Sequence, residues 1–102
     1  MKSLIYIRCN SETAIRRRGA GDIWQGLWEL PTKELLGNAI ENATLIKKNV
    51  KHILTHQIIF ADFYLLETDT PPTLPADYIW IKENEIERYA LPRLIDLLVK
   101  SL

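Results

Sequence analysis

The stretch that decides the fold is Ile58–Glu67, which reads IIFADFYLLE. Apolar side chains occupy both its even and its odd positions, so neither side of the extended segment is consistently polar. Such a pattern is typical of a strand at the centre of a sheet that is covered on both sides. The stretch therefore predicts a central strand with a layer packed on each face.

Working outward, Val50–Thr55 predicts a second strand, joined to the first near His56 and Gln57. Further strands are expected at residues 3–9, 13–18, 27–30 and 78–81. Asn10-Ser11 is a turn signal between the first two of these. The segment 37–48 has scattered apolar positions and predicts loop and weak helix.

Helices are expected in the middle and at the end of the chain. Thr32 is placed to cap a short helix over 33–36, and 83–88 predicts a helical turn. Pro92 opens a final helix with one apolar side, formed by Leu91, Leu94, Ile95, Leu98 and Leu102. Together these elements predict an α+β fold in which a mixed sheet lies between helices. A length of 102 residues leaves room for a single domain, 1–102.

The charges cancel in total but not along the chain. Thirteen Lys and Arg balance thirteen Asp and Glu, which argues against a freestanding electrostatic DNA binder. Residues 1–56, however, hold nine basic and five acidic residues, whereas 57–102 hold four and eight. A basic face is therefore possible, unless folding mixes the two halves.

Several kinds of protein are excluded by what the chain lacks. The single cysteine, Cys9, rules out an internal disulfide framework and a Cys-based zinc or iron–sulfur site within one chain. No apolar run approaches the ~20 residues that cross a bilayer, and the start has no signal-peptide layout. We therefore expect a cytoplasmic protein without a membrane partner.

Few residues suggest chemistry on their own. His52 and His56 are four apart, but on an extended segment that spacing holds them too far apart for one metal ion. In the run 16–18, Arg16 and Arg18 would share one face of a strand. Such a pair can neutralise DNA phosphates, or it can protect the exposed edge of a hairpin.

Three motifs in order resemble the C-terminal domain of the MutY family of adenine DNA glycosylases. An arginine-rich strand, 16–18, leads into Ile23–Pro31, which is similar to the family's Gly-Leu-Trp-x-Gly-Leu-Trp-Glu-Phe-Pro segment. Val50–His56 resembles its His-x-Phe-Ser/Thr-His loop. Tyr89–Pro92, followed by an apolar helix, is like the family's terminus.

The resemblance implies a Nudix-like fold used for recognition in base excision DNA repair. MutY-like enzymes remove adenine mispaired with 8-oxoguanine, and this domain contacts the oxidised guanine. The catalytic carboxylates and the iron–sulfur cluster belong to an N-terminal domain that is missing here. The chain is thus expected to be a fragment of a bacterial, nucleoid-associated glycosylase that carries no cofactor and no catalysis of its own. Its expected partners are double-stranded DNA containing the 8-oxoguanine:adenine mispair and the N-terminal glycosylase domain.

The same resemblance points to the loop that ends in Thr55 and His56 as the lesion contact, with Leu54 as a neighbouring wedge. The 8-oxo form of guanine has an N7–H donor beside a carbonyl acceptor, and a hydroxyl such as that of Thr55 can both accept and donate. Weaker candidates for contact with the DNA backbone are Arg16, Arg18, Lys51 and His52.

Two other functions stay open. A Nudix-type nucleotide diphosphate hydrolase needs a helix with an Arg-Glu-x-x-Glu-Glu-like set that holds a divalent metal. The stretch 32–48 that follows Pro31 offers only Glu34 and Glu41, and no two glutamates are adjacent anywhere in the sequence. A protein-interaction module that uses the apolar helix 92–102 is the third reading.

Overall fold

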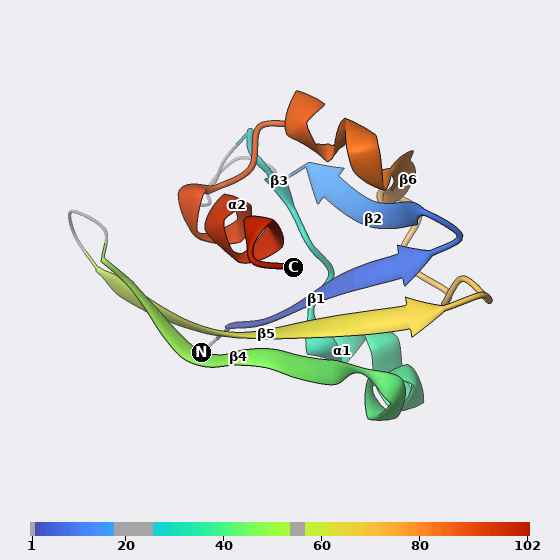
Figure 1. Cartoon of the computed structure of the whole chain (residues 1–102), viewed down its shortest axis with the longest axis horizontal. Coiled ribbons are helices and arrows are strands. Elements are labelled where there is room, and N and C mark those ends of the chain that lie inside the picture. Colours follow the sequence, from blue (N-terminus) through green and yellow to red (C-terminus); the bar gives the residue numbers. More distant parts are fainter. Residues whose placement is uncertain (1, 18–25, 54–56) are drawn as a thin grey trace.

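The computed structural model describes residues 2–17, 26–53 and 57–102. Within them, six strands form one mixed sheet in the order β3-β2-β1-β5-β4, and β6 also pairs with β2 (Figure 1). The strands are β1 (Lys2–Cys9), β2 (Glu12–Arg17), β3 (Trp28–Glu29), β4 (Thr44–Ile53), β5 (Ile58–Thr68) and β6 (Ile79–Lys82). The helical elements are α1 (Lys33–Leu36), η1 (Gly37–Asn42), η2 (Glu83–Arg88) and α2 (Arg93–Lys100), where η marks a 3-10 helix.

The segment chosen from the sequence is the central strand. β5 pairs in parallel with β1, in one register from Lys2 opposite Ala61 to Cys9 opposite Thr68. On its other side β5 pairs antiparallel with β4. The sheet is therefore mixed, and the expected α+β fold in a single domain is confirmed.

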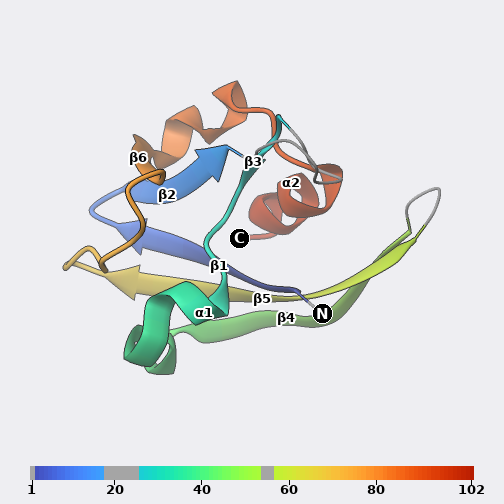
Figure 2. The ribbon, with the colours of Figure 1, turned by 180° about the vertical axis from the view of Figure 1, so that it is seen from behind.

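Helices α2 and α1 lie on opposite sides of the sheet (Figures 1 and 2), and an apolar cluster covers each face. On one face, here called the α2 face, Phe63 and its neighbours pack against Leu94, Ile95 and Leu98 of α2. On the opposite face, the α1 face, Leu66 packs with Leu36 of α1 and with apolar residues of β1. The expected sandwich of a sheet between helices is thus present.

The α1 face is covered over only part of β5. Ile59, Ala61 and Phe63 are buried on the α2 face, but Ile58 and Phe60 on the other face are 52% and 42% exposed. The first half of β5 therefore has one exposed apolar side, and the prediction of a strand covered on both faces holds only for its second half.

β4 begins earlier than the sequence indicated. Residues 44–48 belong to this strand and are not loop or weak helix, whereas 37–42 is helical. Two bulges, between Leu45 and Lys47 and between Lys47 and Val50, interrupt the pairing with β5. Each bulge disturbs the alternation of side chains, which is why the segment carries no two-residue pattern. At the second bulge Asn49 takes a φ of 54°, and its backbone N–H donates to Asp62 Oδ1 at 2.9 Å.

The helices and turns follow local signals. Asn10 and Ser11, which connect β1 and β2, both have positive φ, as a two-residue type I′ hairpin turn requires. Thr32 occupies the N-cap position of α1, but its side chain makes no capping hydrogen bond. Pro92 precedes α2 and accepts a hydrogen bond from the Asp96 N–H at 2.9 Å. No helix in the described part of the chain is long and apolar enough to span a membrane.

Replacing Phe63 by alanine should lower the free energy of unfolding by about 3–5 kcal/mol, because the ring is fully buried. Phe60→Ala on the same strand is the matched control and should cost less than about 1 kcal/mol, since its ring faces solvent. Urea unfolding followed by circular dichroism measures both. Equal losses would contradict the assignment of the two faces.

Candidate nucleic-acid interface

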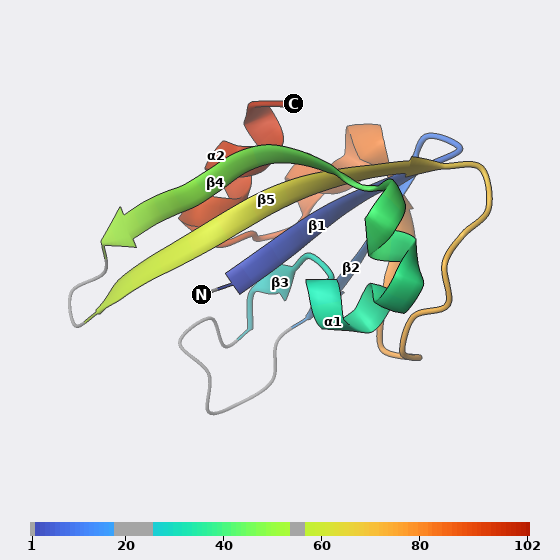
Figure 3. The ribbon, with the colours of Figure 1, turned by 90° about the horizontal axis from the view of Figure 1, so that it is seen from below.

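The β4–β5 hairpin is the element that carries most of the candidate site. Its two strands project beyond the rest of the sheet (Figure 3). β4 ends at Ile53 and β5 begins at Ile58, so Leu54, Thr55 and His56 fall between the two strand ends. These three residues lie outside the described part of the chain, and their predicted contact with a lesion stays a prediction.

Lys51 and His52 lie on opposite faces of this hairpin. Lys51 pairs with Phe60 and is exposed on the α1 face, whereas His52 pairs with Ile59 and is half-buried on the α2 face. The two side chains therefore cannot contact the same stretch of DNA backbone from one surface. Of the pair, Lys51 has the position that suits a phosphate.

β4 carries more positive charge than the sequence reasoning used. Lys47, Lys48 and Lys51 are all exposed on this edge strand, and Thr44–Ile53 contains no acidic residue. The scattered apolar positions of 37–48 predict loop and weak helix, so the sequence gives no sign that Lys47 and Lys48 share a strand with Lys51. Lysines on an edge strand also discourage pairing with another sheet, so this charge has a structural use as well.

Arg16 is paired with protein carboxylates. Its Nε donates to Glu29 Oε1, and its Nη1 donates to Asp77 Oδ2 at 2.8 Å. Glu29 is only 3% exposed, and its hydrogen bond is the main reason that the pKa of Arg16 is raised above its ordinary value. Through these two contacts Arg16 joins β2 to β3 and to the segment before β6, which is a structural role. Arg18, its predicted partner on the same face, lies outside the described residues.

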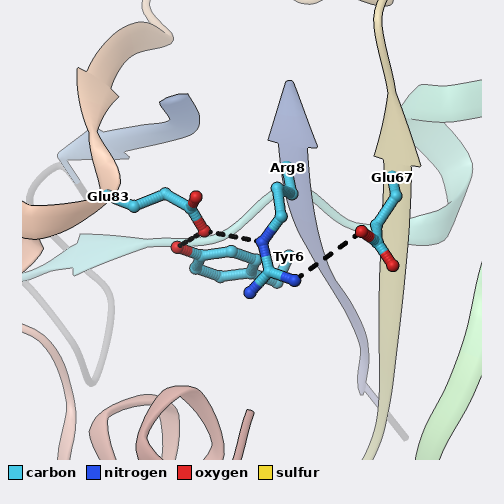
Figure 4. Close-up of polar contacts among 4 residues, drawn as sticks. All are labelled: Tyr6, Arg8, Glu67 and Glu83. Atoms are coloured by element: carbon cyan, nitrogen blue, oxygen red, sulfur yellow. Dashed lines mark hydrogen bonds and ion pairs between the residues drawn. The ribbon is translucent and has the colours of Figure 1, made fainter. Parts of the chain in front are cut away.

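A second polar cluster had no signal in the sequence (Figure 4). Tyr6 Oη and Arg8 Nε both donate to Glu83 Oε1, at 2.8 and 2.9 Å, and Arg8 Nη1 lies 3.8 Å from Glu67 Oε2. Alternation along β1 places Tyr6 and Arg8 on one face, but nothing local links them to Glu83. The cluster fastens the start of η2 to the sheet.

Burial raises the pKa of the Tyr6 hydroxyl well above its ordinary value, and the hydrogen bond to Glu83 raises it further. The hydroxyl thus stays protonated and acts as a donor at neutral pH. Its role is consistent with holding the fold together, because the ring is 3% exposed and packs in the cluster on the α2 face.

The tryptophans in the described residues serve packing. Trp28 packs edge-on against Tyr89, with ring centroids 5.0 Å apart, and its backbone N–H donates to the Ala90 carbonyl at 2.8 Å. Trp80 is half-buried against the cluster on the α1 face. Trp24 lies outside the described part of the chain.

The carboxylates do not gather into a metal-binding set in the part of the chain that is described. There, no three His, Cys, Asp or Glu side chains are grouped closely enough to hold one ion. α1 is only four residues long and carries a single carboxylate, Glu34. One such side chain is a poor donor set for a divalent cation, which needs several oxygen ligands.

With the fold and the hairpin described, the chain can be compared with known proteins. The NUDIX domain family matches residues 3–101, and the chain belongs to this family. No match is found among curated protein sequences.

Several solved structures share the fold, including the following three. The C-terminal domain of mouse MUTYH, solved in complex with human PCNA, has a TM-score of 0.72 at 17% identity, covering 97% of this chain and 83% of that one. The MutT protein of Methanosarcina mazei has a TM-score of 0.64 at 17% identity, covering 98% and 89%. The Nudix hydrolase RenU of M. smegmatis has a TM-score of 0.63 at 11% identity, covering 98% and 80%. At such identities the likeness shows the fold alone.

Arg16→Ala should lower the free energy of unfolding by about 1–3 kcal/mol, because it removes one charged hydrogen-bond donor from the buried Glu29 carboxylate. Arg17→Ala, on the next residue of the same strand, is the control and should cost less than about 1 kcal/mol, since Arg17 is exposed and its hydrogen bond to the Gly26 carbonyl is long, at 3.3 Å. Urea titration measures both. A variant of Arg16 as stable as that of Arg17 would contradict the structural role.

The raised pKa of Tyr6 also predicts a loss of stability in alkali. In the unfolded chain this hydroxyl ionises near pH 10, whereas in the folded protein it keeps its proton to higher pH. Its stabilising effect is therefore complete below about pH 10 and is lost as the pH rises further, by roughly 1.4 kcal/mol per unit. The free energy of unfolding, measured by urea titration at several pH values between 9 and 11, should decrease less steeply with pH for Tyr6→Phe than for the parent. Equal slopes for the two proteins would refute this.

Proposed function

We propose that the chain is the lesion-recognition domain of an A/G-specific adenine DNA glycosylase, and that it reads 8-oxoguanine opposite the adenine to be excised. The observation that carries the proposal is the projecting β4–β5 hairpin, in which residues 54–56 fall between the end of β4 and the start of β5 (Figure 3). The motif order along the chain supports the same reading. The shared fold with the C-terminal domain of mouse MUTYH is consistent with it.

The proposal assigns reading of the base to Thr55 and His56. Oxidation converts guanine N7 from an acceptor to a donor and adds a carbonyl oxygen beside it. A threonine hydroxyl accepts from the first and donates to the second, so one side chain distinguishes the lesion from guanine. His56 supplies a further donor to the base or to a phosphate, and Leu54 fills the space next to it.

In this proposal the chain recognises and does not cut. A glycosylase extrudes its target base before cleavage, and the catalytic carboxylates and the iron–sulfur cluster would belong to an N-terminal domain of the same protein. The 8-oxoguanine:adenine duplex and that domain would be its partners, in the cytoplasm. Because the net charge is zero, the chain alone should bind DNA weakly.

A Nudix-type hydrolase is the second candidate, and the fold shared with a MutT protein and with a Nudix hydrolase favours it. Fold kinship does not carry activity with it, however. The single carboxylate on the four-residue helix α1 makes hydrolysis the weaker reading.

The test compares binding of two duplexes, with adenine opposite 8-oxoguanine and adenine opposite guanine, by fluorescence anisotropy at low salt. The parent chain should prefer the oxidised duplex by about tenfold, the effect of one good base contact. Thr55→Ala with His56→Ala should abolish the preference, whereas Thr73→Ala, an exposed threonine far along the chain, should keep it.

Equal binding of the two duplexes by the parent chain would count against lesion reading. A parallel incubation with 8-oxo-dGTP and magnesium tests the other candidate. We expect no release of pyrophosphate, and turnover would favour the hydrolase.

A further inference from the structure

The end of the β4–β5 hairpin at which β4 stops and β5 starts exposes large apolar side chains that a folded protein usually buries. Ile53, Ile58 and Phe60 are 68%, 52% and 42% exposed. In the pairing of the two strands, Ile53 lies opposite Ile58 and Lys51 lies opposite Phe60. We call these four residues the hairpin patch.

All four side chains of the hairpin patch share the α1 face. Directly opposed residues of an antiparallel pair point to the same side, and positions two apart on one strand do so as well. α1 and η1 pack farther along β5, around Leu66, and among the described residues no helix packs over the patch (Figures 2 and 3). A shallow hollow of about 220 Å³, lined by Lys2, Ile58, Ile59 and Phe60, lies beside it.

The charge around the hairpin patch favours a polyanionic partner. β4 has no acidic residue, and of its three lysines Lys51 lies in the patch itself. Lys47 and Lys48 are exposed farther along the strand, where Lys47 pairs with Phe63 and so falls on the α2 face. Asp62, the next residue along this face of β5, accepts the backbone N–H of Asn49. Nucleic acid offers phosphates for the ammonium groups and sugar and base surfaces for the apolar side chains. A protein partner fits less well, because lysine is depleted in the cores of protein interfaces.

We propose that the hairpin patch is the surface against which the DNA backbone lies beside the lesion, with Phe60 and the two isoleucines on sugars and bases and Lys51 on a phosphate. The inference rests on the proposed function, since the patch adjoins the two strand ends between which the lesion-reading loop begins and ends. It extends the DNA contact from the loop to the strands. It also explains why apolar residues are kept on an exposed face.

Chemical-shift mapping by NMR tests this on the 102-residue chain, because it detects weak binding. Titration with the 8-oxoguanine:adenine duplex at low salt should shift the backbone resonances of Lys51, Ile53 and Phe60 and the methyl resonances of Ile53 and Ile58. Methyl resonances of Leu97, an exposed residue of α2, should stay in place. Perturbation confined to α2 and η2 would overturn the proposal and indicate a partner on the other face.

Variants give a second, quantitative measurement. Phe60→Ala should weaken binding of the duplex about tenfold, the loss of one apolar contact with a base. Leu45→Ala, another exposed apolar residue on the same face but at the far end of β4, should leave binding unchanged. Lys51→Ala should make the slope of log K against log salt shallower by about 1, whereas Lys33→Ala on α1 should not.

The outcomes separate this inference from the proposed function. If Phe60→Ala binds as the parent does while Thr55→Ala with His56→Ala loses the preference for the oxidised duplex, the patch assignment is wrong and lesion reading stands. If oxidised and unoxidised duplexes bind with equal affinity and both shift the patch, the patch binds DNA but the chain does not read 8-oxoguanine. The absence of any shift at millimolar duplex would overturn the patch assignment.

Discussion

The parallel pairing of β1 with β5 is the constraint on which the rest of the structure depends. It joins two segments far apart in sequence along eight residues of each, from Lys2 opposite Ala61 to Cys9 opposite Thr68. Because the register is fixed, Leu4 and Phe63 share the face that α2 covers, while Ile5 and Leu66 meet on the other. β2 then adds to β1 and β4 adds to β5. Both the core and the projecting hairpin follow from this one register.

Among the basic residues in the first half of the chain, the structure distinguishes arginines that form ion pairs from lysines that are exposed on β4. Arg8 and Arg16 are held by carboxylates: Arg8 by Glu83, Arg16 by Glu29 and Asp77. These arginines fasten elements together, and their charge is largely matched within the protein. The three lysines of β4 are instead exposed on one strand. The asymmetry of charge along the sequence therefore reaches the surface at the hairpin, next to the exposed apolar residues.

Membership in the NUDIX domain family establishes the fold, but the function depends on particular residues that the fold positions. The C-terminal domain of mouse MUTYH and a MutT protein share this fold. In this chain α1 has four residues and one carboxylate, and the β4–β5 hairpin carries lysines and exposed apolar side chains. The proposed contact with DNA rests on the second of these features.

The sequence by itself determined the features that rest on local patterns. Three local patterns predict elements that the structure contains: the two-sided apolar run of 58–67 predicts β5, the turn at Asn10-Ser11 predicts the β1–β2 hairpin, and the apolar stripe of the last helix predicts α2. Each pattern extends over only a few neighbouring residues, so it can be recognised without knowledge of the fold. Tertiary structure alone decided the rest. The bulges in β4 remove the two-residue pattern that would mark the start of the strand. Glu83, which is distant in sequence, accepts hydrogen bonds from Tyr6 and Arg8. The packing of α2 on one face of β5 buries Phe63, whereas Phe60 on the other face stays exposed. Each of these depends on contacts between segments far apart in the chain, which no local pattern records.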